Sequence, residues 1–184
     1  MKKVYVLLAE GFEEVEALTP VDLLRRAGVE VVVVSTTGEK VVTGARKSRV
    51  DADILLSDVE IDADILVLPG GIPGVPNLKA NTEVISMIEK YVDAGKYLAA
   101  ICAGPSIPGE MGLLKGHNAT VYPGMEDTLQ GACWTGEDVP VAVSGQFITS
   151  RGVGTAIDFA LKMIEILVSK EKADQIASAI VYRK

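Results

Sequence analysis

A chain of 184 residues with 48% hydrophobic side chains is long enough to bury a core, and its net charge of −7 argues against nucleic acid and anionic membranes as partners. No apolar run approaches the ~20 residues of a membrane span, and Met1-Lys2-Lys3 leads into a strand rather than a signal peptide. Two cysteines, Cys102 and Cys133, cannot build a disulfide framework, which favours the reducing cytoplasm. We therefore expect one cytoplasmic domain over residues 1–184.

Apolar runs alternate with helical patterns along the first half of the chain. A strand at 3–8, a helix that continues to about Arg26 and a strand at 29–35 predict a βαβ crossover with a parallel pair of strands. Pro20 lies inside this helix and should end or kink it near Thr19. The next predicted elements are extended segments at 41–43 and 48–56, a strand at 64–68, a loop at 72–77 and a helix at 81–94.

The second half continues this alternation. The apolar run Tyr97–Ile101 predicts a strand buried on both faces, and Pro108-Gly109 should keep the following helix short or bent. The remaining predicted elements are strands at 119–121, 139–143 and 147–150, helices at 156–168 and 171–179, and an edge strand at 180–182. This order predicts a doubly wound α/β sandwich, whose ligands bind beyond the carboxyl ends of the strands. Three glycine-rich strand ends should meet there, those after Leu8, Leu68 and Ile101.

Cys102 stands at one of these strand ends, and Ala103-Gly104-Pro105-Ser106 turns the chain into a helix. Small residues suit a tight strand-to-helix turn that lifts one side chain above the sheet. The unpaired N–H groups of a helix N-terminus can lower a thiol pKa from about 8.5 to roughly 3.5–7.5. Most free cysteines are simply packed in a core, but this setting favours Cys102 as a reactive thiolate.

A cysteine nucleophile usually acts with a histidine, and the single histidine, His117, lies in a polar stretch that predicts an exposed turn. The alternative partner is the acidic group that begins the first helix, on the same rim as Cys102. Glu13 and Glu14 suit the role of charges that complement the helix dipole. Glu16 lies among apolar neighbours, and a half-buried carboxyl there would have a raised pKa and could donate a hydrogen bond to a thiolate.

The other motifs are less specific. Pro69-Gly70-Gly71 offers backbone N–H groups to an oxyanion, although a simple turn explains it equally well. Arg151-Gly152-Val153-Gly154 lacks the spacing of a dinucleotide fingerprint and predicts a tight turn, from which Arg151 could reach the rim. Cys133 and Trp134 fall in a loop-like region and are expected to pack or to form an interface. The cysteines and the histidine have no zinc-ligand spacing, so no metal site is expected.

Several segments together carry a family resemblance: Ala9–Glu16, Pro20–Asp22 with Arg25–Gly28, Leu68–Gly71, Ala99–Pro105 and Thr149–Thr155. On these residues the chain resembles the ThiJ/PfpI superfamily, in the branch of the Parkinson-associated protein DJ-one, over essentially its whole length. The resemblance implies a flavodoxin-like α/β sandwich of the class I glutamine amidotransferase-like type, with a mostly parallel sheet and helices on both faces. It also implies a homodimer that needs no cofactor.

The resemblance also implies roles for individual residues. Cys102 matches the family's elbow cysteine, and Glu16 matches the carboxyl that hydrogen-bonds it. The other matches are Gly70 and Gly71 in the oxyanion pocket, to which the Ala103 N–H would contribute, Arg151 in an anion pocket, and Arg46 as a dimer-interface arginine near the site. Activities attributed to the family are glyoxalase and protein deglycase chemistry on glyoxals and their adducts, chaperone behaviour and oxidative-stress sensing.

Two positions depart from the family's pattern. Protease-like relatives carry histidine directly after the elbow cysteine, where this chain has Ala103. Tyr122 stands where the DJ-one branch often has a site histidine, which leaves Glu16 as the main proton carrier. Two functions stay open at this point. One is an enzyme whose Cys102 attacks a small dicarbonyl, and the other is a redox-sensing chaperone or binding protein whose thiol is oxidised to sulfenic and then sulfinic acid.

Overall fold

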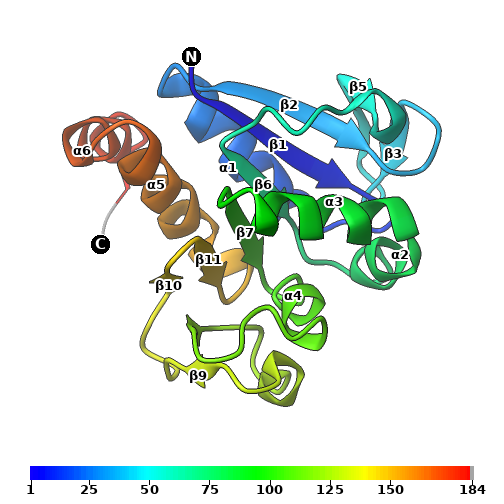
Figure 1. The fold of residues 1–184 in the computed structure, drawn as a ribbon. Helices are drawn as coiled ribbons and strands as arrows, with labels where there is room; N and C mark the ends of the chain where they lie inside the picture. Colours follow the sequence, from blue (N-terminus) through cyan, green and yellow to red (C-terminus); the bar gives the residue numbers. More distant parts are fainter. Residues whose placement is uncertain (183–184) are drawn as a thin grey trace.

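A seven-stranded sheet forms the centre of the molecule, described for residues 1–182 by a computed structural model (Figure 1). Its strands lie in the order β10-β11-β7-β6-β1-β2-β5. Neighbouring strands pair in parallel, except that β10 and β11 are antiparallel. The strand bounds are β1 (Lys3–Leu8), β2 (Glu30–Ser35), β5 (Ile54–Leu55), β6 (Ile65–Leu68), β7 (Tyr97–Ile101), β10 (Val141–Ser144) and β11 (Phe147–Ser150).

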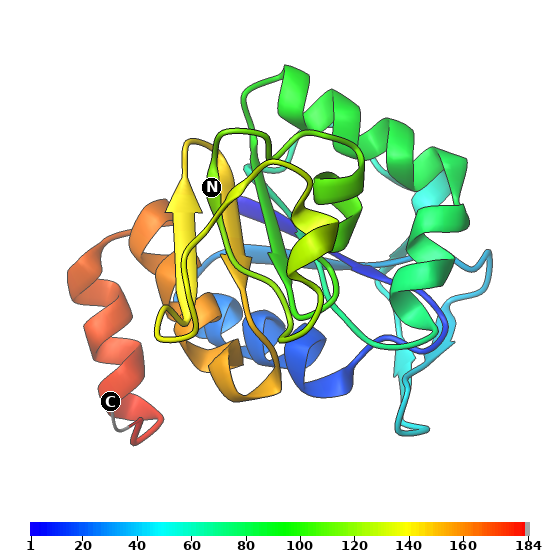
Figure 2. The ribbon, with the colours of Figure 1, turned by 90° about the horizontal axis from the view of Figure 1, so that it is seen from below.

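The central strands are apolar on both faces because helices cover both faces. Along β1, Val4, Val6 and Leu8 pack into one core, whereas Tyr5 and Leu7 pack into the other. The first core includes side chains of α1 (Glu14–Arg26), α5 (Ala156–Leu167) and α6 (Lys170–Ala179), and the second includes those of α2 (Gly74–Ala80), α3 (Thr82–Asp93) and α4 (Ser106–Glu110). Figure 2 shows the two groups on opposite sides of the sheet, which confirms the predicted sandwich. Within residues 1–182, no helix has both the length and the apolar character needed to cross a bilayer.

Smaller elements border the central sheet. They are the antiparallel pair β3 (Val41–Thr43) and β4 (Arg49–Asp51), the parallel pair β8 (Asn118–Ala119) and β9 (Cys133–Trp134), and the 3₁₀ turns η1 (Leu56–Asp58), η2 (Glu126–Leu129) and η3 (Val153–Thr155). Cys133 and Trp134 form β9 rather than a loop, and both side chains are exposed instead of packed in the core, whereas the interface expected for them stays a prediction.

The carboxyl ends of β1, β6 and β7 lie side by side. Val6 pairs with Val67, and Val67 pairs in turn with Ala99, in parallel register. The three glycine-rich segments that follow these strands therefore reach one edge of the sheet, as the sequence predicts. This edge holds the candidate site.

Helix α1 reaches Arg26, as the sequence predicts, but Pro20 does not end it. The helix is continuous from Glu14 to Arg26 and does not end near Thr19. Pro20 removes one backbone hydrogen bond, but the neighbouring side chains of Ala17 and Val21 are buried in the core. Burial of this face outweighs the local preference of proline.

Two further segments also differ from the prediction. The loop predicted at 72–77 contains the start of α2, whose Gly74 and Val75 N–H groups donate to the carbonyls of Gly11 (3.1 Å) and Gly71 (2.9 Å). The edge strand predicted at 180–182 is a turn, in which the Tyr182 N–H donates to the Ala177 carbonyl (2.9 Å) and so closes α6. In both segments, hydrogen bonds that the local sequence pattern does not reveal determine the backbone conformation.

Candidate active site

Cys102 occupies a strained turn directly after β7. Its φ is +63°, in the left-handed region that residues other than glycine rarely adopt. The backbone holds this conformation from two sides: the Cys102 N–H donates to the Ser150 carbonyl (3.0 Å), and its carbonyl accepts from the Tyr122 N–H (2.9 Å). Gly104 makes the turn possible, because a Cβ there would lie 2.6 Å from the Leu68 carbonyl oxygen. The surrounding strands thus impose an elbow that lifts the half-buried thiol above the sheet.

Glu16 reaches the same point from the first turn of α1. It is fully buried, and its Oε2 accepts a hydrogen bond from the Gly70 N–H (3.0 Å). A Cβ on Gly70 would lie 2.5 Å from Oε2, 2.7 Å from the Cys102 Cβ and 3.1 Å from the Cys102 Sγ. Glycine at position 70 therefore lets the carboxyl and the thiol meet. From the sequence, the Gly70 N–H is expected to bind an oxyanion, but in the structure this N–H donates to Glu16.

Glu16 and Cys102 each affect the pKa of the other. Burial raises the pKa of Glu16 to about 7, and the negative charge of Glu13 acts in the same direction, whereas hydrogen bonds with Cys102 and Gly70 oppose the shift. Burial also raises the pKa of the Cys102 thiol to about 12, with the charge of Glu16 as the next cause, although the Ala103 N–H acts against it.

The lowered thiol pKa that the sequence predicts is therefore wrong, because burial of the thiol is the main cause of its raised pKa and the charge of Glu16 adds to it. The following helix α4 has only 5 residues, so its dipole is weak, and the side-chain charges acting on the thiol are those of the carboxylates Glu16 and Glu13. The geometry instead suits a carboxylate that takes the thiol proton during attack. A group with a pKa of about 7 is well placed for that task near neutral pH.

Cys102 and Glu16 open into a cavity of about 1010 Å³. Of the other residues predicted for the site, the structure brings Gly71, Ala103, Arg46 and Arg151 to its wall, whereas Gly70 does not line the cavity and instead donates its N–H to Glu16. The wall also includes Glu13, which the sequence places on this rim, and Tyr122, at the position of the family's site histidine. Sequence patterns did not connect the further wall residues Ile72, Glu137, Asp138 and Val153 with Cys102. Among residues 1–182, no cluster of three or more His, Cys, Asp or Glu side chains is arranged to hold a metal ion.

Arg151 is fixed to the cavity wall by its own loop. Its N–H donates to Thr155 Oγ1 (3.2 Å), and its Nη1 donates to the Glu137 carbonyl. The Nε is buried and has no hydrogen-bond partner within the described part of the chain. The role in anion binding that the resemblance implies for Arg151 stays a prediction, which its position at the cavity makes testable.

Glu14 has a role that the sequence did not indicate. It is buried, and its Oε1 accepts from the N–H groups of Arg46 (2.7 Å) and Ser48 (3.2 Å). These bonds tie the β3–β4 turn to α1 and hold Arg46 against the cavity. The partners lie more than 30 residues away in the sequence, so local spacing contains no signal for them.

His117 lies away from the cavity. Its ring packs edge-on to Phe147 with 4.8 Å between ring centroids, and its Nδ1 lies 3.2 Å from Ser144 Oγ. It is thus a partly buried packing residue rather than the solvated loop residue that the sequence predicts. Tyr122, in contrast, borders the cavity and is half-exposed.

Comparison with known proteins identifies the family, because the DJ-1/PfpI family profile matches residues 2–166. The chain belongs to the DJ-1/PfpI family. It is 39% identical over 184 residues to Protein DJ-1 homolog A of Arabidopsis thaliana, covering 99% of this chain but 47% of that relative. The chain thus spans about half the length of the first curated relatives it matches.

Two further relatives of the DJ-1/PfpI chain cover most or all of its length. A protein of Pyrococcus abyssi named as a deglycase is 33% identical over 166 residues, covering 90% of this chain and 99% of the relative. The solved structure of oxidized Toxoplasma gondii DJ-1 superposes with a TM-score of 0.93 at 39% identity, covering 100% of both chains. The family resemblance and the flavodoxin-like fold predicted from the sequence are confirmed.

Proposed function

We propose that this DJ-1/PfpI protein is a cysteine-dependent, cofactor-free glyoxalase or deglycase that acts on glyoxal, methylglyoxal or their adducts. The observation that carries the proposal is the contact between Cys102, on its strained turn, and the fully buried Glu16 with a pKa of about 7. The Pyrococcus abyssi relative named as a deglycase supports the same chemistry.

The first step is the addition of sulfur to the aldehyde carbon. Glu16 takes the thiol proton as the Cys102 Sγ attacks, a C–S bond forms, and the carbonyl electron pair moves to oxygen. The N–H groups of Gly71 and Ala103 at the cavity wall would stabilise the resulting oxyanion. Protonation of this oxygen gives a hemithioacetal.

The second step is an internal redox exchange in which Glu16 moves one proton. Glu16 removes the proton from the carbon bonded to sulfur and returns it to the neighbouring carbonyl carbon through an enediol, while the hydroxyl proton of the first carbon passes to the oxygen of the second. The first carbon is oxidised to a thioester while the second is reduced to an alcohol, so no external oxidant or reductant is needed. Water then cleaves the C–S bond and releases a 2-hydroxy acid and the thiol. With an adduct as substrate, the amine or thiol that carried the dicarbonyl first leaves with a proton and regenerates the aldehyde, and the same steps then release the 2-hydroxy acid and the Cys102 thiol.

Product formation from methylglyoxal tests the proposal. The measurement compares lactate formation by the wild type, Cys102→Ser and Cys133→Ser, with the exposed Cys133 as the matched control. We expect Cys133→Ser to match the wild type and Cys102→Ser to fall to the uncatalysed background. Stoichiometric oxidation of Cys102 by peroxide without lactate formation would favour the redox-sensing alternative. Equal turnover by Cys102→Ser would show that Cys102 is not the nucleophile and would contradict the proposal.

The pH dependence of thiol alkylation tests the proton carrier. Because Glu16 has a pKa of about 7, we expect Cys102 alkylation in the wild type to change near this pH. In Glu16→Gln the inflection should disappear, since the amide does not titrate. An identical profile in both proteins would remove Glu16 from the mechanism.

The proposal includes a homodimer in the cytoplasm. A reducing compartment would keep Cys102 available as a thiol. Arg46, which lies at the cavity wall within one chain, is expected on the dimer side of the site. Light scattering across a dilution series measures the oligomeric state.

A further inference from the structure

Large apolar side chains gather on the wall of the Cys102 cavity while remaining open to solvent. Ile72 is 67% exposed, Tyr122 50% and Val153 47%, and all three line the cavity. They come from three separate segments, which follow β6, β8 and β11. Scattered exposed apolar residues need no explanation, but convergence on one cavity marks a surface that binds an apolar group.

This apolar wall is joined directly to the reacting centre. The Tyr122 N–H donates to the Cys102 carbonyl (2.9 Å), and the Tyr122 ring lies over Gly152, where a Cβ would be 3.6 Å from the ring. Ile72 follows Gly71, whose own Cβ would clash with the Glu13 N atom at 2.4 Å. A substituent bound by the wall would therefore lie at a defined place relative to the thiol.

Neither the charge of the cavity wall nor the cavity volume indicates selection for a small charged substrate. Its wall carries both signs, with Glu13, Glu137 and Asp138 opposed by Arg46 and Arg151. A cavity of about 1010 Å³ lies at the upper end of the roughly 300–1,000 Å³ typical of sites for much larger ligands than a two- or three-carbon dicarbonyl. The exposed apolar side chains are thus the feature that can discriminate between substrates.

We propose that Ile72, Tyr122 and Val153 select 2-oxoaldehydes that carry an aromatic or bulky aliphatic group beside the dicarbonyl. The inference rests on the proposed function for its chemistry, and it names the substrate class of the same site. The bonds formed and broken are those of the mechanism above, because the substituent takes no part in the reaction. Phenylglyoxal, which yields mandelate, represents this class.

Substrate competition tests the selection. The measurement is the ratio of kcat/KM for phenylglyoxal to kcat/KM for glyoxal in the wild type, Ile72→Ala and Tyr122→Ala. We expect each variant to lower this ratio about tenfold, in the range observed when an apolar pocket loses contact with a substrate group. Comparing ratios between proteins cancels the different intrinsic reactivities of the two aldehydes. The matched control is Ile61→Ala, since Ile61 is also exposed (36%) but lies outside the cavity.

A binding measurement separates failure of the inference from failure of the proposed function. Mandelate and lactate are compared as protectants of Cys102 against alkylation, which requires no turnover. We expect mandelate to protect at about tenfold lower concentration in the wild type, and this advantage to shrink in Ile72→Ala and Tyr122→Ala. Protection by mandelate without turnover of any aldehyde would overturn the glyoxalase proposal and keep the apolar site. Turnover with unchanged ratios in the variants would overturn the inference and keep the glyoxalase.

Discussion

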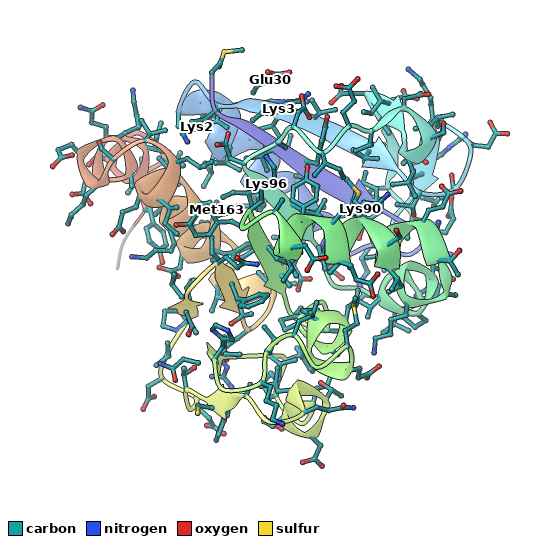
Figure 3. The ribbon with its side chains drawn as sticks, viewed as in Figure 1. Lys2, Lys3, Glu30, Lys90, Lys96 and Met163 are labelled. Atoms are coloured by element: carbon teal, nitrogen blue, oxygen red, sulfur yellow. The ribbon has the colours of Figure 1, made fainter. Side chains whose placement is uncertain are left out.

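The two ends of the parallel strands differ in how their charged side chains are paired and in how strained the backbone is. At the amino ends, Lys2 pairs with Asp64 (3.0 Å) and Lys3 with Asp62 (2.7 Å). Lys96, just before β7, donates to a backbone carbonyl just before β6 (2.7 Å). Figure 3 labels Lys2, Lys3 and Lys96 at this end of the sheet. Each of these cations has a partner, and the groups involved are close to solvent.

At the carboxyl ends the pairing is incomplete and the backbone is strained. Cys102 has a φ of +63°, and within residues 1–182 the buried Glu16 Oε1 and Arg151 Nε have no hydrogen-bond partner. Strain and unpaired buried groups cost free energy of folding and persist mainly where function uses them. The contrast indicates that the amino ends serve stability, whereas the carboxyl ends hold groups prepared for chemistry.

The largest expected effect that tests this contrast is the pH dependence of stability caused by Glu16. Its pKa is raised from 4.5 to about 7, so the folded chain binds more protons than the unfolded chain between these values. Stability from the neutral carboxyl is therefore complete below about pH 4.5 and is lost as the pH rises to about 7. At 1.36 kcal/mol per pKa unit, the free energy of unfolding should fall by about 3 kcal/mol relative to Glu16→Gln over this range.

Urea unfolding at several pH values measures this difference. The amide of Glu16→Gln does not titrate, so the gap between wild type and variant should change up to about pH 7 and then level off. Glu89→Gln, which removes an exposed carboxyl of α3, should follow the wild type throughout. If the gap between wild type and Glu16→Gln is constant with pH, Glu16 is not the buried carboxyl with a raised pKa that the contrast requires.

The second effect is steric. In Gly70→Ala the new Cβ would meet Glu16 Oε2 at 2.5 Å and the Cys102 Cβ at 2.7 Å, and neither residue is free to move. Overpacking of this kind should lower the free energy of unfolding by about 2 kcal/mol and separate the thiol from the carboxyl. Gly154→Ala is the control, because a Cβ there has no neighbour within 4 Å. Denaturant unfolding gives the stability, and thiol alkylation reports the contact. A Gly70→Ala variant as stable as Gly154→Ala would show that the site is loosely packed.

The sequence predicts the central strands well because their signal is local. Continuous apolar runs such as Tyr97–Ile101 predict strands of a sheet that is covered on both faces. The small residues after Cys102 predict the tight strand-to-helix turn at this position. What could not be predicted depends on distant contacts. Helix α2 begins at Gly74 by donating to the Gly11 carbonyl, and the thiol pKa depends on how closely Glu16 approaches. The spacing of residues along the chain predicts neither the contact between Gly74 and Gly11 nor the contact between Glu16 and Cys102.

A third prediction concerns Glu14, whose hydrogen bonds to the β3–β4 turn only the structure revealed. Glu14→Ala removes the acceptor of the Arg46 and Ser48 N–H groups, and both donors lie in a turn that water can reach. We therefore expect a loss of about 1 to 2 kcal/mol in stability, less than for a fully buried pair. Faster hydrogen exchange should be confined to the β3–β4 turn. Glu14→Gln keeps one acceptor oxygen and should lose less; if both variants exchange like the wild type, Glu14 does not position Arg46.

The smallest effect is expected at the amino ends, where the pairs are exposed. Lys2→Met removes the ammonium that pairs with Asp64 but keeps the length of the side chain, and Asp64 Oδ2 still accepts from the Lys3 N–H (2.9 Å). Water replaces the lost partner, so the free energy of unfolding should change by less than about 0.5 kcal/mol and the difference should vanish in high salt. Thermal unfolding at low and high ionic strength provides the measurement. A loss as large as that of Gly70→Ala would mean that paired surface charges also hold the fold together, and the division between a stabilising end and a chemical end of the sheet would fail.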